Sequence, residues 1–463
     1  MSRMSRVIPV AAALGASLLL IDQVASQTFT SRARDPGVRG GPAAAGGPLA
    51  GLTARELAYF NAGRADFAEV ETVPDGLGPT MNLDSCGGCH SQPAVGGTSP
   101  ATNPQIAFAR KLGAANVLPP FIRIDGPVRE ARYVKNADGT DDGGVHAIFT
   151  IAGRTDAPGC RLPQEDFVTQ VGRGNVVFRI PTPVFGAGLI EHIPDWAILA
   201  NQASDRPIKQ PLGIGGRANF AVAGRTMSGQ ANNNGNDGTV ARFGWKAQNK
   251  SLLLFAGEAY NVEMGISNEL FPTEREERPG CQFATVPNDV KDTETASPID
   301  ATSAIEKFAL FQRFLAPPTP SATTPGGSDS ITRGRTGFSD VGCALCHTPM
   351  LRTGNAAVAA LRYKQANLYS DLLTHDMGPE LSDGVSQGQA GGREFRTAPL
   401  WGVGQRVFFL HDGRTSDLVE AIQAHQSGRT STGDASEANA VVRGFNGLTE
   451  GAKQDILNFL RSL

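Results

Sequence analysis

Apolar side chains recur at helical spacing in three segments of the chain. Residues 53–70, 303–315 and 449–463 each place them three or four positions apart, with one interruption in the first segment. This spacing predicts an amphipathic helix in each segment, and the second helix stops before Pro317-Pro318. The positions that define the three stripes are Leu57, Phe60, Phe67, Val70, Ile305, Phe308, Phe311, Leu315, Ile456, Leu457, Leu460 and Leu463.

Between the first two helices the pattern changes to short apolar runs separated by turn residues. Examples are residues 121–126, the turn 136–139 and the turn 234–238, and a strand is expected over 145–151. The chain of 463 residues contains 55 Gly and 30 Pro, which together make about 18% against an average near 12%. We therefore expect a mainly α fold with irregular loops and β-hairpins, and not an all-helical bundle.

The N-terminus has the pattern of a cleaved export signal. Basic residues up to Arg6 precede 15 uncharged residues from Val7 to Ile21, and small residues lead to an expected cleavage after Ser26. A membrane anchor is the alternative, but Asp22 ends the apolar run before the roughly 18–20 residues that a span needs. We expect a signal peptide over 1–26, a flexible leader over 27–50, a periplasmic or secreted protein, and no membrane span after cleavage.

The net charge and the length of the chain limit the class of partner and the number of domains. Lys and Arg number 42 and Asp and Glu number 45, for a net charge of −3, so nothing indicates a nucleic-acid partner. The length predicts two or three domains. The stretch 316–330, rich in Pro, Thr, Ser and Gly, is the best boundary, which gives domains over 51–316 and 331–463.

Two motifs carry the chemistry: Cys86-Gly-Gly-Cys89-His90 and Cys343-Ala-Leu-Cys346-His347. Two cysteines three residues apart can bind the vinyl groups of one haem as thioethers, and the adjacent histidine can ligate its iron. A zinc site is the alternative, but it would require four protein ligands in one closed site. We therefore expect two covalently bound haem c groups, with His90 and His347 on the irons.

Two cysteines remain outside these motifs. In an oxidising compartment a disulfide between Cys160 and Cys281 is the simplest assignment, and two buried free thiols are the alternative. Among the other histidines, His146 and His192 are interpreted as structural. Met227, Met264, Met350 and Met377 are unranked candidates for axial ligands.

Further segments resemble the di-haem c-type oxidoreductases, a family related to bacterial di-haem cytochrome c peroxidases and to di-haem rubber oxygenases. The resemblance runs from about residue 53 to the C-terminus. The matching segments are Gly76-Leu-Gly-Pro79, Cys86-Gly-Gly-Cys-His90, Phe185-Gly-Ala-Gly-Leu-Ile190, Ile193-Pro-Asp195, Arg242-Phe-Gly-Trp-Lys-Ala247, Glu263-Met-Gly-Ile266, Cys343-Ala-Leu-Cys-His347-Thr-Pro349, His375-Asp-Met-Gly378, Arg396-Thr-Ala-Pro-Leu-Trp401 and Leu410-His-Asp-Gly-Arg414.

The resemblance implies two cytochrome-c-like haem domains with both haems near their interface. The N-terminal haem would be open and reactive, and the C-terminal haem would be an electron reservoir closed by a sixth ligand. In the peroxidases that ligand is a methionine in the helix after the His-Asp-Gly turn, but here the matching helix, 417–426, offers His425. A second histidine implies a lower potential than His/Met ligation and is similar to the rubber oxygenases.

The resemblance also suggests roles for residues around the haems. Trp245 would carry electrons or pack on a porphyrin, and Arg242 and Lys246 would neutralise haem propionates. Arg396 and Arg414 could do the same in the second domain. Glu258 and Glu263 are the candidate proton donors for O–O cleavage, with a solvated helix face as the alternative.

Three functions follow from this interpretation. The favoured one is a peroxidase-like enzyme that takes electrons from a small redox donor protein and reduces a small-molecule oxidant. An oxygenase of the rubber-oxygenase type and an electron-transfer cytochrome without its own substrate are the alternatives. Related peroxidases bind calcium between domains, but hairpin turns are the favoured explanation of the acidic loops that contain Asp138, Asp141, Asp142 and residues 234–237.

Overall fold

The computed structural model describes residues 32–114, 116–142, 148–151, 154–162, 166–204, 206–220, 226–227, 230–231, 239–273, 278–428 and 435–463. Residues 33–463 form one structural unit. The expected signal peptide, His146 and the acidic loop at 234–237 lie outside the described residues.

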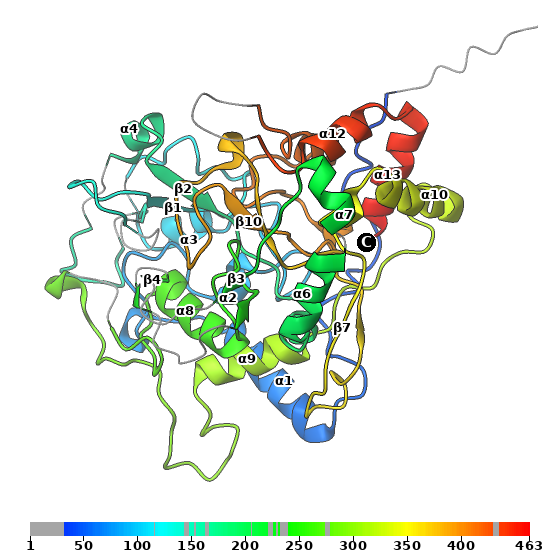
Figure 1. Ribbon diagram of the computed structural model, residues 1–463. Coiled ribbons are helices and arrows are strands. Elements are labelled where there is room, and N and C mark those ends of the chain that lie inside the picture. The colour runs from blue at the N-terminus through cyan, green and yellow to red at the C-terminus, as the bar shows by residue number, and fades with distance from the viewer. Residues whose placement is uncertain are drawn as a thin grey trace, which may run out of the picture. The chain divides into compact units, whose positions relative to one another are not determined.

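Helices supply most of the regular structure in these ranges (Figure 1). They are α1 (Ala54–Phe67), α2 (Cys86–Cys89), α3 (Gln105–Lys111), α4 (Phe167–Gly172), α5 (Ala187–Glu191), α6 (Asp195–Ser204), α7 (Arg206–Lys209), α8 (Leu252–Met264), α9 (Ala304–Phe314), α10 (Gly327–Asp340), α11 (Leu418–Gln423), α12 (Asn439–Asn446) and α13 (Glu450–Ser462).

The strands are short and pair only as antiparallel two-stranded hairpins or ribbons within the described residues. The pairs are β1 (Glu130–Tyr133) with β2 (Val176–Arg179), β3 (Asn219–Phe220) with β6 (Val240–Ala241), β4 (Thr226–Met227) with β5 (Gln230–Ala231), β7 (Leu351–Arg352) with β8 (Gln365–Ala366), and β9 (Thr374–Asp376) with β10 (Glu394–Arg396). In the last pair His375 lies opposite Phe395. The expected helix-rich fold with small β-hairpins is therefore confirmed, whereas the two cytochrome-c-like domains stay a prediction.

The three helices predicted from apolar spacing are present as α1, α9 and α13. Thr53 caps α1 in a reciprocal capping box with Glu56, and the Thr449 hydroxyl accepts a hydrogen bond from the Ala452 amide at the start of α13. Helix α1 packs on α9, and α10 packs on α13. The local pattern was sufficient here because each helix buries one face and exposes the other.

Two long helices were not predicted. Helix α8 buries residues all around its axis, so it has no polar stripe from which a helical period could be read. Helix α10 begins inside the expected boundary at 316–330 and is rich in Gly, Ser and Thr. Its Gly334 is required for close packing, because a Cβ there would lie 1.9 Å from the backbone oxygen of Asp455 in α13.

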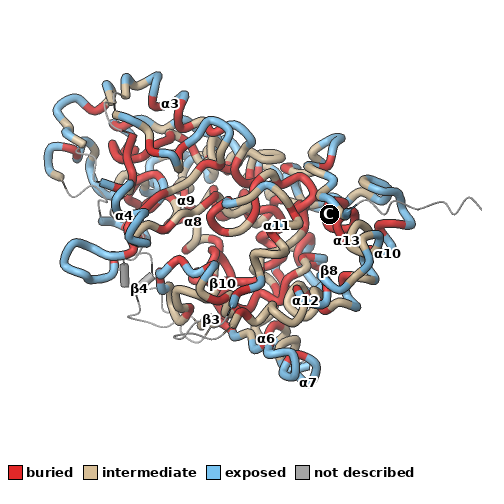
Figure 2. The backbone as a smooth tube through the Cα atoms, turned by 90° about the horizontal axis from the view of Figure 1, so that it is seen from above, coloured by how far each residue is buried: buried red, intermediate tan, exposed pale blue. Residues whose placement is uncertain are grey.

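The largest core cluster includes residues from both sides of the expected domain boundary. Phe60 and Phe311 lie in it together with Leu361, Leu373 and Trp401. A second cluster joins α10, α11, α12 and α13, and buried segments run through the interior of the fold (Figure 2). The division into 51–316 and 331–463 stays a prediction, and the largest cluster extends across it.

The described part of the expected leader differs from a flexible segment. The Arg39 amide donates to the Gly404 carbonyl at 2.7 Å, and the Leu49 amide donates to the Phe314 carbonyl at 2.7 Å. Asp35 forms a two-pronged ion pair with Arg461, whose side chain is 1% exposed. The composition of residues 32–50 did not reveal these contacts with distant residues, nor the packing of Ala45 and Leu49 against the largest core cluster.

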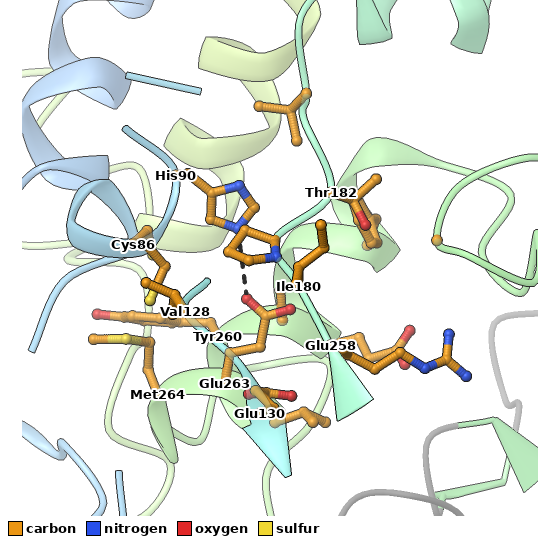
Figure 3. A pocket seen from close by; sticks show the side chains of 18 of the residues that line it. Cys86, His90, Val128, Glu130, Ile180, Thr182, Glu258, Tyr260, Glu263 and Met264 are labelled. Carbon is orange, nitrogen blue, oxygen red and sulfur yellow. Dashed lines mark ion pairs between the residues drawn. The ribbon is translucent and has the colours of Figure 1, made fainter. Parts of the chain in front are cut away.

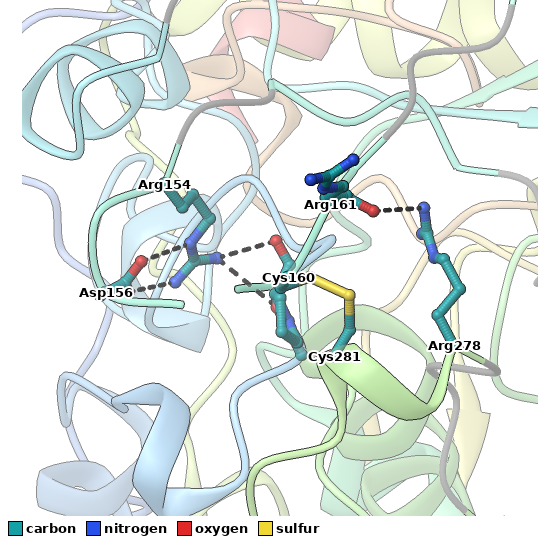
Figure 4. The surroundings of a disulfide bond; sticks show 8 residues. Arg154, Asp156, Cys160, Arg161, Arg278 and Cys281 are labelled. Atoms are coloured by element: carbon teal, nitrogen blue, oxygen red, sulfur yellow. Dashed lines mark hydrogen bonds and ion pairs between the residues drawn. A yellow bond between two sulfur atoms is a disulfide. The ribbon is translucent and has the colours of Figure 1, made fainter. Parts of the chain in front are cut away.

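A disulfide joins Cys160 to Cys281, which confirms the pairing favoured from the sequence (Figure 4). Its Cα atoms are 4.6 Å apart, and it links segments separated by 121 positions. Next to it the Arg278 guanidinium donates to the Arg161 carbonyl at 3.5 Å. The alternative of two buried free thiols is therefore excluded by this pairing.

No helix within the described ranges is both long enough and apolar enough to cross a membrane.

Candidate haem sites

The first CxxCH motif forms a single helical turn. The Ser85 hydroxyl caps α2 by accepting from the Gly88 amide, and the His90 amide donates to the Cys86 carbonyl at 2.9 Å. His90 Nδ1 lies 3.0 Å from the Gly97 carbonyl. Donation from Nδ1 leaves the Nε2 lone pair available for a metal, which is the arrangement an iron ligand requires.

A cavity, here called the first cavity, opens in front of this motif. Its wall includes Cys86, Cys89 and His90, together with Glu258 and Glu263 of α8 (Figure 3). Burial is the main cause that raises the pKa of both thiols above its ordinary range. The cysteines are therefore neutral thiols and not reactive thiolates.

The two predicted acids occupy different positions in this wall. Glu258 is buried and its carboxylate accepts a hydrogen bond from the Asn249 amide. Glu263, whose side chain is 46% exposed, places Oε2 at 3.9 Å from His90 Nε2 (Figure 3). The structure thus brings both acids to the wall of the first cavity, with Glu258 buried and Glu263 partly open to solvent.

The second CxxCH motif is held in a similar way. Cys343–Leu345 form a 3-10 turn, and the His347 amide donates to the Cys343 carbonyl at 2.9 Å. His347 Nδ1 lies 3.0 Å from the Tyr369 carbonyl, which again leaves Nε2 for a metal. Burial, with a smaller contribution from His425, lowers the pKa of His347 to about 4, so its imidazole is neutral and able to ligate at pH 7.

His425 lines the same cavity, here called the second cavity, as Cys343, Cys346 and His347. It follows α11, which Asp417 caps, and its Nδ1 lies 2.7 Å from the Ala421 carbonyl. Its Nε2 is therefore also the nitrogen left for a metal. The structure brings His425 to the second motif as the sequence suggested, and its role as sixth ligand stays a prediction.

The methionines that are candidate axial ligands lie in different parts of the structure. Met264 lines the first cavity and Met377 lines the second. Met350 is 37% exposed, and the side chain of Met227 lies outside the described part of the structure.

Trp245 lines both cavities. Its side chain is nearly buried, and its indole Nε1 donates to the Ile180 carbonyl at 3.1 Å. Its own carbonyl accepts from the Arg396 amide at 2.8 Å. These bonds fix the indole between the two CxxCH motifs, as the resemblance implied, although they do not distinguish electron transfer from packing.

Arg242 and Lys246 are not placed as expected. Arg242 pairs with Asp195 and donates to the Ile193 and Val240 carbonyls. The Lys246 ammonium lies 3.0 Å from Asp383 and 2.9 Å from the Gly391 carbonyl. Within the described ranges neither side chain lines the first or second cavity. Both cations are buried, and a buried charge needs a partner of opposite sign. Here Asp195 and Asp383 supply it, and both are distant in sequence, so the pairing could not be predicted from the sequence.

Two other arginines take the position expected for propionate partners. Arg396 and Arg406 are buried and both line the second cavity. The Nε of Arg396 has no hydrogen-bond partner in the described part of the chain, and no described carboxylate forms an ion pair with either guanidinium. Burial lowers the pKa of each to about 10. Arg396 Nη1 donates to the Arg242 carbonyl at 3.0 Å, but neither cation has a carboxylate partner among the described residues. Two such buried cations fit a ligand that carries carboxylates.

Arg396 was a sequence candidate, but Arg406 was missed. No motif marks Arg406, and its role depends on packing against Arg396, whose pKa its charge lowers further. Arg414, the other candidate, pairs instead with Asp412. The oriented imidazoles fit an iron ligand in each cavity, and the arginine pair adds partners for haem propionates in the second cavity.

The remaining histidines are held by protein groups. His192 Nδ1 lies 2.8 Å from the Gly188 carbonyl, which agrees with its structural interpretation. His375 lies between Glu437, at 2.7 Å, and Asp371, at 3.1 Å.

The acidic loop near residue 138 is closed by local contacts. Asp138 accepts from Thr140, and Asp141 pairs with Lys135. In the described ranges no group of three or more His, Cys, Asp or Glu side chains is arranged to hold a metal ion.

Comparisons with known proteins add the family. No curated protein matches the chain. A structure of hydrazine synthase from Kuenenia stuttgartiensis, under 20 bar of xenon, is 20% identical with a TM-score of 0.22, and the match covers 36% of this chain and 56% of that one. The chain thus matches little more than half the length of that protein. A MauG-like protein associated with microbial copper homeostasis is 17% identical with a TM-score of 0.28, covering 54% of this chain and 77% of that one.

A family model matches residues 128–463, a range that contains the second CxxCH motif and begins after the first. The model is described as "Di-haem oxidoreductase, putative peroxidase", and this chain belongs to that family.

Proposed function

We propose that the protein is a periplasmic di-haem c-type oxidoreductase that reduces peroxide. Electrons from a small redox donor protein would enter at the haem of His347 and pass to the haem of His90, where the oxidant binds. The observation that carries this proposal is that one side chain, Trp245, lines both cavities, each of which has its own CxxCH motif.

The two cavities differ in a way that supports different tasks. Cys86 and Cys89 would hold one haem and Cys343 and Cys346 the other, and the haem irons supply electron transfer and oxidant binding. The first cavity offers two carboxylates, Glu258 and Glu263, near His90. The second cavity has a mainly apolar wall, which contains His375, His411 and His425 besides His347. Carboxylates beside the iron ligand suit a reacting site, and a further histidine ligand, here assigned to His425, suits a reservoir.

The carboxylates have a definite task in this reaction. Reduction of hydrogen peroxide to two waters consumes two electrons and two protons. Glu258 and Glu263 lie on one helix in the wall of the first cavity and can hand on the protons, with Asn249 holding the Glu258 carboxylate in place. Trp245 lies where the electrons must pass between the cavities.

The predicted signal peptide and the Cys160–Cys281 disulfide support export to an oxidising compartment. A second candidate function, oxygenation of an apolar alkene, is favoured by one observation: His425 lines the second cavity where the peroxidases have a methionine.

The test is rapid mixing of the fully reduced holoprotein with hydrogen peroxide and, separately, with oxygen. A peroxidase reoxidises both haems quickly with peroxide. A lasting oxygen adduct at one haem, with slow oxidation by peroxide, would instead support the oxygenase. Absence of a fast reaction with either molecule would contradict both and leave the electron-transfer cytochrome.

A further inference from the structure

We propose that the carboxylate of Glu263 is the resting axial ligand of the iron that His90 holds, a ligand that an incoming oxidant displaces. The inference rests on the proposed attachment of a haem at Cys86, Cys89 and His90. It goes beyond a proton-transfer role, because it assigns Glu263 to the metal itself.

The distance between the two side chains carries the inference. Glu263 Oε2 lies 3.9 Å from His90 Nε2, which is too long for a hydrogen bond. Bonds from a metal to an imidazole nitrogen or a carboxylate oxygen are about 2 Å, as measured for zinc. One metal ion bound by both groups on opposite sides would therefore separate the two donor atoms by about 4 Å.

The orientation of the imidazole agrees with this assignment. Nδ1 of His90 is occupied by the Gly97 carbonyl at 3.0 Å, so Nε2 is the ligating nitrogen, and it is the one that faces Glu263 (Figure 3). Among the described residues, His90 is the only group for which Glu263 shows an ion pair, and no hydrogen bond to its carboxylate is present. The carboxylate is thus available to a metal.

The backbone around Glu263 is anchored to the segment before the motif. Helix α8 ends at Met264, whose carbonyl accepts from the Gly78 amide at 2.9 Å. Gly265 follows with φ +74°, and a Cβ there would lie 2.8 Å from the Gly78 Cα. This close approach fixes the end of α8 against residues that lead into Cys86. The Glu263 side chain, in contrast, is half exposed, so the solvent side of the cavity leaves room for its carboxylate to give way to an oxidant.

Glu258 supplies a matched control. It lies on the same helix and lines the same cavity, but Asn249 holds its carboxylate. A carboxylate is a weak-field ligand, so the iron of His90 would be six-coordinate and high-spin in the resting ferric protein. Oxidant binding would then require only that the oxidant replace the carboxylate on the iron, an exchange in which no electron is transferred.

The experiment uses ferric holoprotein and the variants Glu263→Ala, Glu263→His and Glu258→Gln. Resonance Raman spectra report coordination number, and low-temperature EPR in ¹⁷O-enriched water reports whether water is bound. For wild type and Glu258→Gln we expect a six-coordinate high-spin haem whose EPR signal ¹⁷O-water does not broaden. We expect Glu263→Ala to become five-coordinate or to show the broadening, and Glu263→His to convert the high-spin signal to a low-spin one.

The contrary outcomes separate this inference from the proposed function. A five-coordinate wild type, a wild-type signal broadened by ¹⁷O-water, or a Glu263→His variant that stays high-spin would overturn ligation by Glu263 while leaving an accessible haem for peroxide. Only low-spin signals in the wild type would overturn both. An unchanged low-spin signal from the second haem shows in each variant that the fold is retained.

Discussion

The indole of Trp245 contacts the imidazole of His411 edge to face, with ring centroids 6.5 Å apart. Both side chains line the second cavity. His411 in turn stacks on Phe395 at 4.3 Å. The indole is therefore part of a buried aromatic group that extends from the wall of the first cavity into the wall of the second. Trp245 is therefore the residue at which the proposed electron transfer between the two haems is best tested.

Replacing Trp245 tests whether it carries electrons or only packs. We expect Trp245→Phe to keep both haems and their spectra but to slow electron transfer from the second haem to the first by at least about tenfold, a barrier increase near 1.4 kcal/mol. Stopped-flow reoxidation by peroxide measures this rate. A rate equal to that of wild type would assign the indole to packing alone.

His425 should set the potential of the second haem. His425→Met is expected to keep this haem low-spin and to raise its midpoint potential, because methionine replaces a stronger donor. Spectroelectrochemical titration measures both haems in one experiment. His192→Gln is the matched control, since His192 bonds only a backbone carbonyl in its own helix. If the His425 variant behaves like the control, His425 is not a ligand.

The buried arginine pair should stabilise negative charge on the second haem. We expect Arg406→Gln to lower the midpoint potential of that haem and to leave the first haem unchanged, because a cation near the reduced, more negative haem is lost. Arg414→Gln is the control, since Arg414 pairs with Asp412 outside the wall of the second cavity. Equal potentials in the two variants would exclude Arg406 as a propionate partner.

The ion pair between Asp35 and Arg461 should anchor the N-terminal segment. Both side chains are buried, so Asp35→Asn should lower the free energy of unfolding by roughly 3 kcal/mol. The hydrogen bonds of Arg461 lower the pKa of Asp35 against the opposing effect of burial. The stabilisation is therefore fully present above the ordinary carboxyl pKa of 3.8 and is lost as pH falls below it.

Urea unfolding of both proteins between pH 3 and pH 7 measures this difference. A difference that grows toward low pH, or one that is absent at pH 7, would show that residues 33–49 are not held by this pair.

The features that were predicted correctly are those whose sequence pattern lies within one short segment. The caps at Thr53 and Thr449 and the apolar stripes of α1, α9 and α13 lie within single segments, and so do the two CxxCH motifs. The disulfide could be inferred because only two cysteines remained for it.

The errors have a common physical cause, which is that partners come from distant segments. Arg242 and Lys246 were read as propionate partners, but Asp195 and Asp383 neutralise them. No sequence motif marks Arg406, which lines the second cavity. Helix α8 has no alternation of apolar and polar residues at helical spacing, because buried residues lie all around its axis. Such features depend on which parts of the chain meet, and a single sequence does not contain that information.

The central claim is that the haem of His90 can accept a small molecule while the haem of His347 is closed by protein ligands. Low-temperature EPR on the purified protein, in the diferric state and after reduction by one electron, tests it most directly. We expect a high-spin ferric signal from one haem and a low-spin signal from the other in the diferric sample. If both samples give only low-spin signals, both haems have six ligands. That result would contradict the proposal that the protein is an enzyme.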